Sequence, residues 1–115
     1  VGCQIGKHAK RLGVHINFAP DLDINTNPKN PIIGNRSFGE NRDNVVDKGT
    51  AFAMGMESAG VLANGKHFPG HGDTEVDSHH NLPVIPFSRQ RLDSLELYPF
   101  KKLIRYGSSF RSAIS

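Results

Sequence analysis

The chain has 115 residues, of which 37% are hydrophobic and 22% are charged, and its formal net charge is +3. These values exclude a disordered or fibrous protein and leave room for one modest domain. The lone cysteine, Cys3, excludes an internal disulfide. No apolar run approaches the roughly 20 residues that cross a membrane, and no basic motif with interleaved aromatic residues indicates nucleic-acid binding.

The N-terminal sequence predicts the end of a helix followed by a strand. Ile5, Ala9 and Leu12 share one helical face, and Gly13 stands where a helix would stop. Residues 14–18 then alternate apolar and polar side chains, as a short strand does. Because the opening VGCQIGKHAK has neither an initiator methionine nor a signal-peptide core, we expect the chain to start inside a larger protein.

A long loop and a second helix follow. Residues 21–40 are rich in proline, glycine and asparagine and have no sustained periodicity. Loops of this length in compact domains are usually functional or disordered. Asn41 is a suitable N-cap for a helix that runs to about Ala59, and Gly60 ends it. The short apolar run at residues 61–63 is typical of a buried strand in a parallel sheet.

The C-terminal third predicts two more helices. Residues 82–87 read as extended because of their prolines. Ser88 is a suitable cap for a helix to about Glu96, and Pro99 fits the first turn of another that ends near Arg105. Helices that alternate with short apolar strands favour an α/β fold with a parallel sheet. In such folds the functional groups collect on loops after the carboxyl ends of strands.

The segment KHFPGHGDTEVDSHHNLP, residues 66–83, contains four of the six histidines. Its histidines and aspartates are all possible metal ligands. The pair His67 and His71 has the spacing that converges on a metal from a helix, but Pro69 and Gly70 lie between them and argue against that helix. The hypothesis of a metal-dependent hydrolase that uses His67, His71 and His79 is therefore less favoured than proton transfer.

Proton transfer is a better match to this segment. In an extended stretch, Asp77 and His79 can point the same way, and a carboxylate can orient a histidine that exchanges protons near neutral pH. Lys66 and His67 at the strand end can donate hydrogen bonds to the hydroxyls of a polar ligand, and Arg36 on the first long loop can donate to a sugar hydroxyl or a carboxylate. The alternative for all five is an ordinary polar surface.

The order of these residues resembles a known family signature. The pattern K-H-F-P-G-H-G, then D-x-x-x-D-S-H, then L-P is similar to that of family 3 glycoside hydrolases of the β-N-acetylglucosaminidase, or β-hexosaminidase, type. The upstream sequences N-F-A-P-D-L-D-I-N and N-P-x-x-P-I-I-G-N-R-S-F-G belong to the same resemblance, which covers the chain from about Ile5 to Ile104.

The resemblance implies an architecture and a reaction. It implies that residues 1–105 are middle βα units of a (β/α)₈ TIM-type catalytic barrel, and that residues 106–115 are a divergent tail. The reaction would remove terminal non-reducing β-linked N-acetylglucosamine by a retaining mechanism, without a cofactor. His79 would be the acid/base and Asp77 its partner. Arg36, Lys66 and His67 would contact the sugar, and His71 and Asp73 would shape the loop. The neighbouring His80 would not be the acid/base.

The family's nucleophilic aspartate has no counterpart in this sequence. We therefore expect the 115 residues to be inactive alone, and an incomplete barrel is expected to leave sheet edges and apolar faces uncovered. A non-catalytic carbohydrate-binding remnant is the second alternative. The resemblance leaves the compartment open between bacterial cytoplasm and cell envelope.

Overall fold

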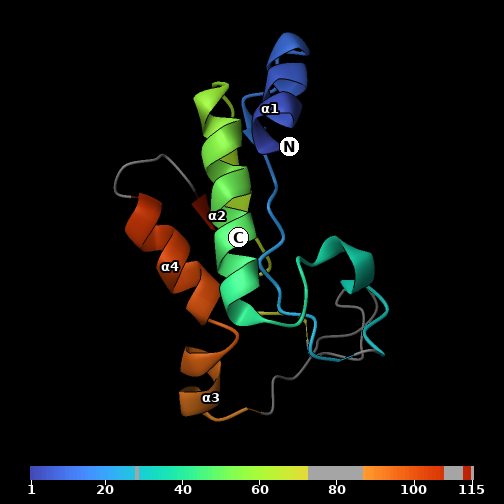
Figure 1. Cartoon of the computed structure of the whole chain (residues 1–115), viewed down its shortest axis with the longest axis vertical. Helices are drawn as coiled ribbons and strands as arrows, with labels where there is room; N and C mark the ends of the chain where they lie inside the picture. Colours follow the sequence, from blue (N-terminus) through green and yellow to red (C-terminus); the bar gives the residue numbers. More distant parts are fainter. Residues whose placement is uncertain (28, 73–86, 108–112, 115) are drawn as a thin grey trace.

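The computed structural model describes the chain except residues 28, 73–86, 108–112 and 115 (Figure 1). Its elements are α1 (Gly2–Arg11), β1 (Ile16–Asn17), the 3₁₀ helix η1 (Gly34–Arg36), α2 (Arg42–Ser58), β2 (Leu62–Gly65), α3 (Arg89–Ser94), α4 (Tyr98–Gly107) and β3 (Ala113–Ile114). The four predicted helices are confirmed within a few residues, and so are the two predicted strands. The predicted extended stretch at residues 82–87 falls almost wholly outside the described residues.

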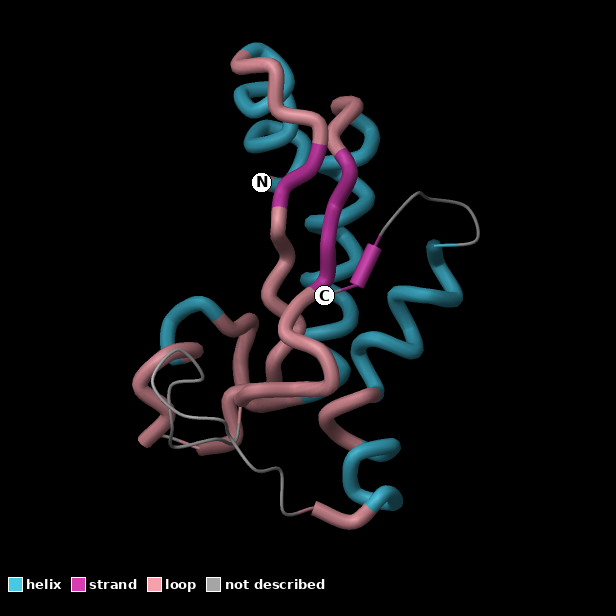
Figure 2. Tube along the Cα trace, turned by 180° about the vertical axis from the view of Figure 1, so that it is seen from behind, coloured by secondary structure: helices cyan, strands magenta, loops and turns pink. Residues whose placement is uncertain are grey.

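The three strands form one parallel sheet in the order β1-β2-β3. Ile16 lies opposite Leu62, and Asn64 lies opposite Ala113. Strand β3 is not predictable from the sequence, because two residues are too few to show a period. Figure 2 shows the strands on one side of the molecule with the long helices behind them. The parallel α/β class is thereby confirmed, with a helical layer on one face of the sheet.

Local sequence signals set the bounds of α2, the longest helix. The Asn41 side chain accepts hydrogen bonds from the backbone N–H groups of Asp43, at 2.9 Å, and Asn44, at 3.1 Å, which satisfies two donors of the first turn. Gly60 ends the helix with a positive φ of 90°. Helix α1 packs closely on α2 because a Cβ at Gly6 would lie only 2.8 Å from the Cβ of Ala59.

The hydrophobic core lies between the sheet and the helices. Its buried members are Leu22, Ala53, Met56, Val61, Ala63, Phe100 and Leu103. By contrast, Ile16 is 49% exposed and Phe18 is 62% exposed. Within the described residues nothing covers most of these two apolar side chains. No described helix is long and apolar enough to span a bilayer.

Candidate functional site

Backbone hydrogen bonds beyond β1 and β2 bring two loops together. The N–H of Leu22 donates to the carbonyl of Lys66 at 2.7 Å, and the N–H of Lys66 donates to the carbonyl of Pro20 at 3.2 Å. Asp21 and Lys66 consequently form an isolated parallel bridge just past the strands. Both loops leave the carboxyl ends of their strands, where functional groups of parallel α/β folds gather.

Asp23 is the centre of a hydrogen-bond network on this rim. Its Oδ2 accepts from His67 twice, from the ring Nδ1 at 2.6 Å and from the backbone N–H at 3.1 Å. Its Oδ1 accepts from the backbone N–H of His71 at 2.5 Å. Burial favours the neutral acid, but the hydrogen bonds from His67 and His71 outweigh it and hold the pKa of Asp23 below its usual range. The ionised carboxylate makes Nδ1 of His67 a donor, so Nε2 is the ring nitrogen left for a ligand.

The two long loops are also joined to each other. The Asn30 amide donates to the carbonyl of His71 at 2.6 Å, while its Oδ1 accepts from the N–H groups of Ile32 and Ile33 at 2.9 and 2.8 Å. Gly72 allows the closest approach, since a Cβ there would lie 1.9 Å from the Ile24 carbonyl oxygen. The loop of residues 21–40 is therefore ordered against residues 70–72 over its described part.

Asp21 has an unusual environment for a carboxylate. It is only 7% exposed. Its Oδ1 accepts from the N–H of Asp23 at 3.0 Å, whereas its buried Oδ2 accepts no hydrogen bond from the described residues. Two side-chain nitrogens lie within 4 Å of Oδ2, Nη2 of Arg36 at 3.8 Å and Nδ1 of His67 at 3.9 Å. Burial, followed by the negative charge of Asp23, raises the pKa of Asp21 to about 7.

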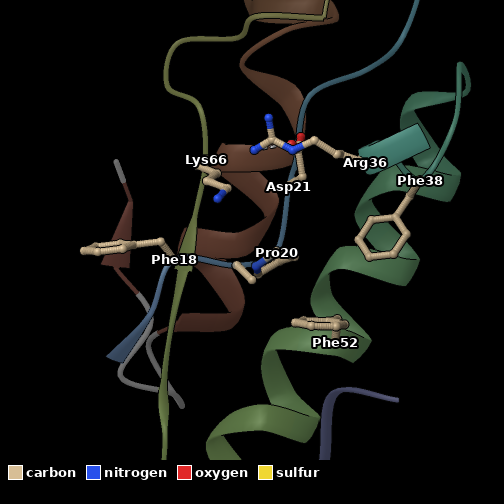
Figure 3. Close-up of a pocket in the computed structure, with 8 residues that line it drawn as sticks. Phe18, Pro20, Asp21, Arg36, Phe38, Phe52 and Lys66 are labelled. Atoms are coloured by element: carbon tan, nitrogen blue, oxygen red, sulfur yellow. Dashed lines mark ion pairs between the residues drawn. The ribbon is translucent and has the colours of Figure 1, made fainter. Parts of the chain in front are cut away.

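A pocket of about 290 Å³ opens beside this network. Its lining residues are Phe18, Ala19, Pro20, Asp21, Arg36, Phe38, Phe52 and Lys66. Figure 3 shows Arg36 and Lys66 at one end, the ring of Phe52 on α2, and the ring of Phe38 on the segment between η1 and α2. The pocket thus combines cationic donors with aromatic surface, which suits a polar ligand that also has apolar faces.

One group of described residues has the composition of a metal site. Ligand atoms of Asp21, Asp23 and His67 all lie within 4.8 Å of one another. However, both oxygens of Asp23 already accept hydrogen bonds, and the Arg36 guanidinium lies beside Asp21. A bound cation would compete with the first interactions and be repelled by the second. The donor set therefore fits a hydrogen-bonded network better than a metal centre.

The structure brings together three of the five residues that the sequence singled out. Arg36 and Lys66 line the pocket, and His67 lies next to Asp21 and Asp23. The other two, Asp77 and His79, lie outside the described residues, as does His80. Sequence reasoning missed both carboxylates of P-D-L-D. Their signal was available, because two aspartates at i and i+2 after a strand point to the same side of the sheet.

Comparison with known proteins decides the family. Residues 1–110 match the model of the glycosyl hydrolase family 3 N-terminal domain. The chain belongs to glycoside hydrolase family 3. The resemblance found in the sequence is confirmed.

Individual members of family 3 are similar over nearly all of the chain. The β-hexosaminidase A of Pseudoalteromonas piscicida is 48% identical over 105 residues, which are 91% of this chain and 18% of that protein. A family 3 β-N-acetylglucosaminidase structure from Paenibacillus sp. has a TM-score of 0.91 and 48% identity, and the match covers 98% of this chain and 22% of that one. Neisseria gonorrhoeae NagZ in complex with N-trifluoroacetyl-D-glucosamine has a TM-score of 0.85 and 36% identity, and the match covers 92% of this chain and 31% of that one. The chain therefore spans about a fifth to a third of the length of these family 3 relatives.

Proposed function

We propose that this chain forms part of a glycosidase that removes terminal non-reducing β-linked N-acetylglucosamine. The observation that carries the proposal is the pocket that holds Arg36 and Lys66, with His67 beside it, on loops that follow two neighbouring parallel strands. The names of the family 3 relatives support it, as does the N-trifluoroacetyl-D-glucosamine bound to the neisserial protein. The substrate is a glycoside that contains N-acetylglucosamine.

The pocket suggests how the sugar is held. The Arg36 guanidinium and the Lys66 ammonium donate hydrogen bonds to ring hydroxyls, and the ring of His67 offers Nε2 from the orientation that Asp23 imposes. The aromatic wall packs against the apolar face of the pyranose ring. These roles follow from the chemistry of the side chains and from their shared location.

We assign the chemical steps to residues that come after Gly72 in the sequence. In our proposal His79 protonates the departing glycosidic oxygen in the first step and then activates water in the second, and Asp77 orients it. A histidine with an ordinary pKa of about 6.5 can alternate between these roles near neutral pH. The mechanism is retaining, so it needs a nucleophilic carboxylate as well. We assign that group to no residue of the chain, and we propose that the 115 residues alone are inactive.

The proposed architecture is a slice of a (β/α)₈ barrel. Residues 1–105 would be its middle βα units, and residues 106–115 a divergent tail whose Ala113 and Ile114 extend the sheet. The single helical layer and the exposed Ile16 and Phe18 support this proposal, since a closed barrel would cover that face of the sheet.

The test of the function is an assay on a full-length enzyme that contains this segment, with an aryl β-N-acetylglucosaminide as substrate. The variant His79→Ala should lower kcat about 10²- to 10⁴-fold, because the acid/base is lost. Asp77→Asn should lower it in the same direction and shift the pH profile. His15→Ala, at an exposed histidine directly before β1, is the matched control. Turnover by His79→Ala at the level of that control would refute the assigned role.

A non-catalytic carbohydrate-binding protein is the second candidate, favoured by the presence of the pocket without an assignable nucleophile. Calorimetry with N-acetylglucosamine on the folded 115-residue chain distinguishes the two. Saturable binding by the chain, together with absent hydrolysis in the full-length protein, would favour the binding role. Absence of binding by folded chain would remove it.

A further inference from the structure

The buried, unpaired oxygen of Asp21 is the feature that the proposed function leaves unexplained. A buried polar atom without a hydrogen-bond partner normally destabilises a fold. Such departures from good packing are concentrated at functional sites. Here the unpaired Oδ2 lies within 3.9 Å of Nη2 of Arg36 and of Nδ1 of His67, two of the proposed sugar contacts. Its position beside these two residues, together with its burial, suggests that it acts in ligand binding.

Two cationic side chains and a histidine surround Asp21. Arg36 approaches from η1, Lys66 is its bridge partner just beyond β2, and His67 follows. Among the described residues, Asp23 is the other carboxylate of this cluster, and its Oδ2 already accepts a hydrogen bond from the His67 ring. Figure 3 shows the guanidinium of Arg36 lying close to the Asp21 carboxyl at the rim of the pocket.

We propose that Asp21 is a positioning and specificity residue, whose carboxylate holds the Arg36 guanidinium at the pocket rim and offsets its charge so that the pocket accepts neutral hydroxyls in preference to anions. This inference rests on the proposed function, because it assigns Arg36 to the sugar.

The positioning half of the proposal follows from the weak restraint on Arg36. Its side chain is 45% exposed, and it starts from a three-residue 3₁₀ helix. The only hydrogen bond that this side chain makes among the described residues is from Nη1 to the Ile32 carbonyl at 3.4 Å, near the limit for such a bond. An arginine has much rotamer freedom to lose when it binds a ligand. A fixed negative charge beneath it reduces that loss.

The specificity half follows from the charge of the pocket. Arg36 and Lys66 by themselves would form a cationic site, the usual setting for a phosphate or carboxylate. A carboxylate 3.8 Å from Arg36 lowers the local potential and repels an anion at the same place. A neutral hydroxyl suffers no such repulsion and can still accept a hydrogen bond from the guanidinium.

The variant Asp21→Asn isolates the charge. Its amide oxygen can still accept from the N–H of Asp23, while the amide nitrogen replaces Oδ2 and faces Arg36 as a donor. In the full-length enzyme at pH 8, where Asp21 is mostly ionised because its pKa is about 7, we expect KM for the aryl β-N-acetylglucosaminide to rise about tenfold with little change in kcat. Inhibition by inorganic phosphate should become about tenfold tighter. Asp47→Asn, which also removes one negative charge but lies on the exposed side of α2, should change neither value.

A double-mutant cycle separates positioning from a merely structural role. In an Arg36→Met background, Asp21→Asn should change KM less than about twofold, because the group that Asp21 positions is gone. Equal effects of Asp21→Asn with and without Arg36 would overturn the proposal, and so would unchanged phosphate inhibition. If Asp21→Asn does not fold, judged by its melting curve, the smaller Asp21→Ser is measured in the same cycle and against the same criteria.

Failure of this inference and failure of the proposed function are distinguishable. If the wild-type enzyme hydrolyses the glycoside but the phosphate inhibition of Asp21→Asn is unchanged, only the role of Asp21 fails. If the wild type does not hydrolyse it, the proposed function fails. Calorimetric titration with inorganic phosphate still tests the charge offset, which requires tighter phosphate binding by Asp21→Asn than by wild type.

Discussion

The ring Nδ1 of His67 and the backbone N–H of the same residue both donate to one oxygen of Asp23, at 2.6 and 3.1 Å. A carboxylate 44 positions earlier in the chain thereby fixes both the ring and the peptide of this histidine. The second oxygen of Asp23 accepts from the His71 N–H, so this one side chain holds the backbone of the second loop at both His67 and His71. Asp23 thus connects the structure of the first loop to the geometry of the pocket.

The variant Asp23→Asn should disturb both the first loop and the geometry of the pocket. Because the buried carboxylate is charged, each hydrogen bond that it accepts contributes about 1.5–3 kcal/mol. An amide has only one acceptor oxygen, and its NH₂ group would face a donor. We expect the free energy of unfolding in urea to fall by about 3 kcal/mol and KM for the aryl glycoside to rise at least about tenfold. Asp47→Asn is the control. Unchanged stability of Asp23→Asn would show that the network does not hold the loop.

The raised pKa of Asp21 predicts a pH dependence of stability with a definite sign. Between its ordinary pKa of 3.8 and its folded value of about 7, the folded protein holds a proton that the unfolded chain releases. The contribution of this group to stability is therefore complete in acid and is lost as the pH rises through about 7. Asp21→Asn has no such proton, so its melting temperature relative to wild type should rise by about 5 °C from pH 5 to pH 8. Asp23 titrates below this range and does not obscure the effect. A constant difference between the two melting temperatures would contradict the assignment.

Gly72→Ala tests whether close loop contact is needed for the site. The added Cβ would lie 1.9 Å from the Ile24 carbonyl oxygen and 2.6 Å from its carbon, and neither backbone atom is free to move like a side chain. The loop should therefore separate from residues 23–24, and the His71 to Asp23 hydrogen bond should weaken. We expect a loss of stability of about 2–3 kcal/mol and a rise in KM. Lys48→Ala, at an exposed position on α2, is a control with little expected effect.

The sequence predicted the elements well where local chemistry is decisive. Asn41 and Ser88 cap α2 and α3 as expected, since a cap depends on the next three residues alone. β3 escaped prediction because only its pairing with β2 defines it. In the same way, η1 lies within what read as an irregular loop.

The sequence allowed us to choose residues of the site, but not to predict which of them hydrogen-bond to one another. Lys66, His67 and Arg36 could be chosen because they follow strands or belong to the family pattern. The bond of Asp23 to His67 joins residues 44 positions apart, and no local rule specifies it. Folding creates such a pair only when β1 and β2 become neighbours. The two aspartates of P-D-L-D were therefore overlooked, although their position after a strand was visible.

The hypothesis of a metal-dependent hydrolase can be tested on the residues of this same network. Asp21, Asp23 and His67 are close enough together to be ligands, yet Asp23 gives both oxygens to hydrogen bonds and Arg36 competes for Asp21. Elemental analysis of purified full-length enzyme should therefore find far less than one equivalent of zinc or manganese. Dialysis against a chelator should leave glycoside turnover unchanged, because the proposed steps use only protons, hydrogen bonds and a carboxylate nucleophile. One equivalent of zinc that is lost together with activity, and is absent from His67→Ala, would replace the hydrogen-bonded network with a metal centre.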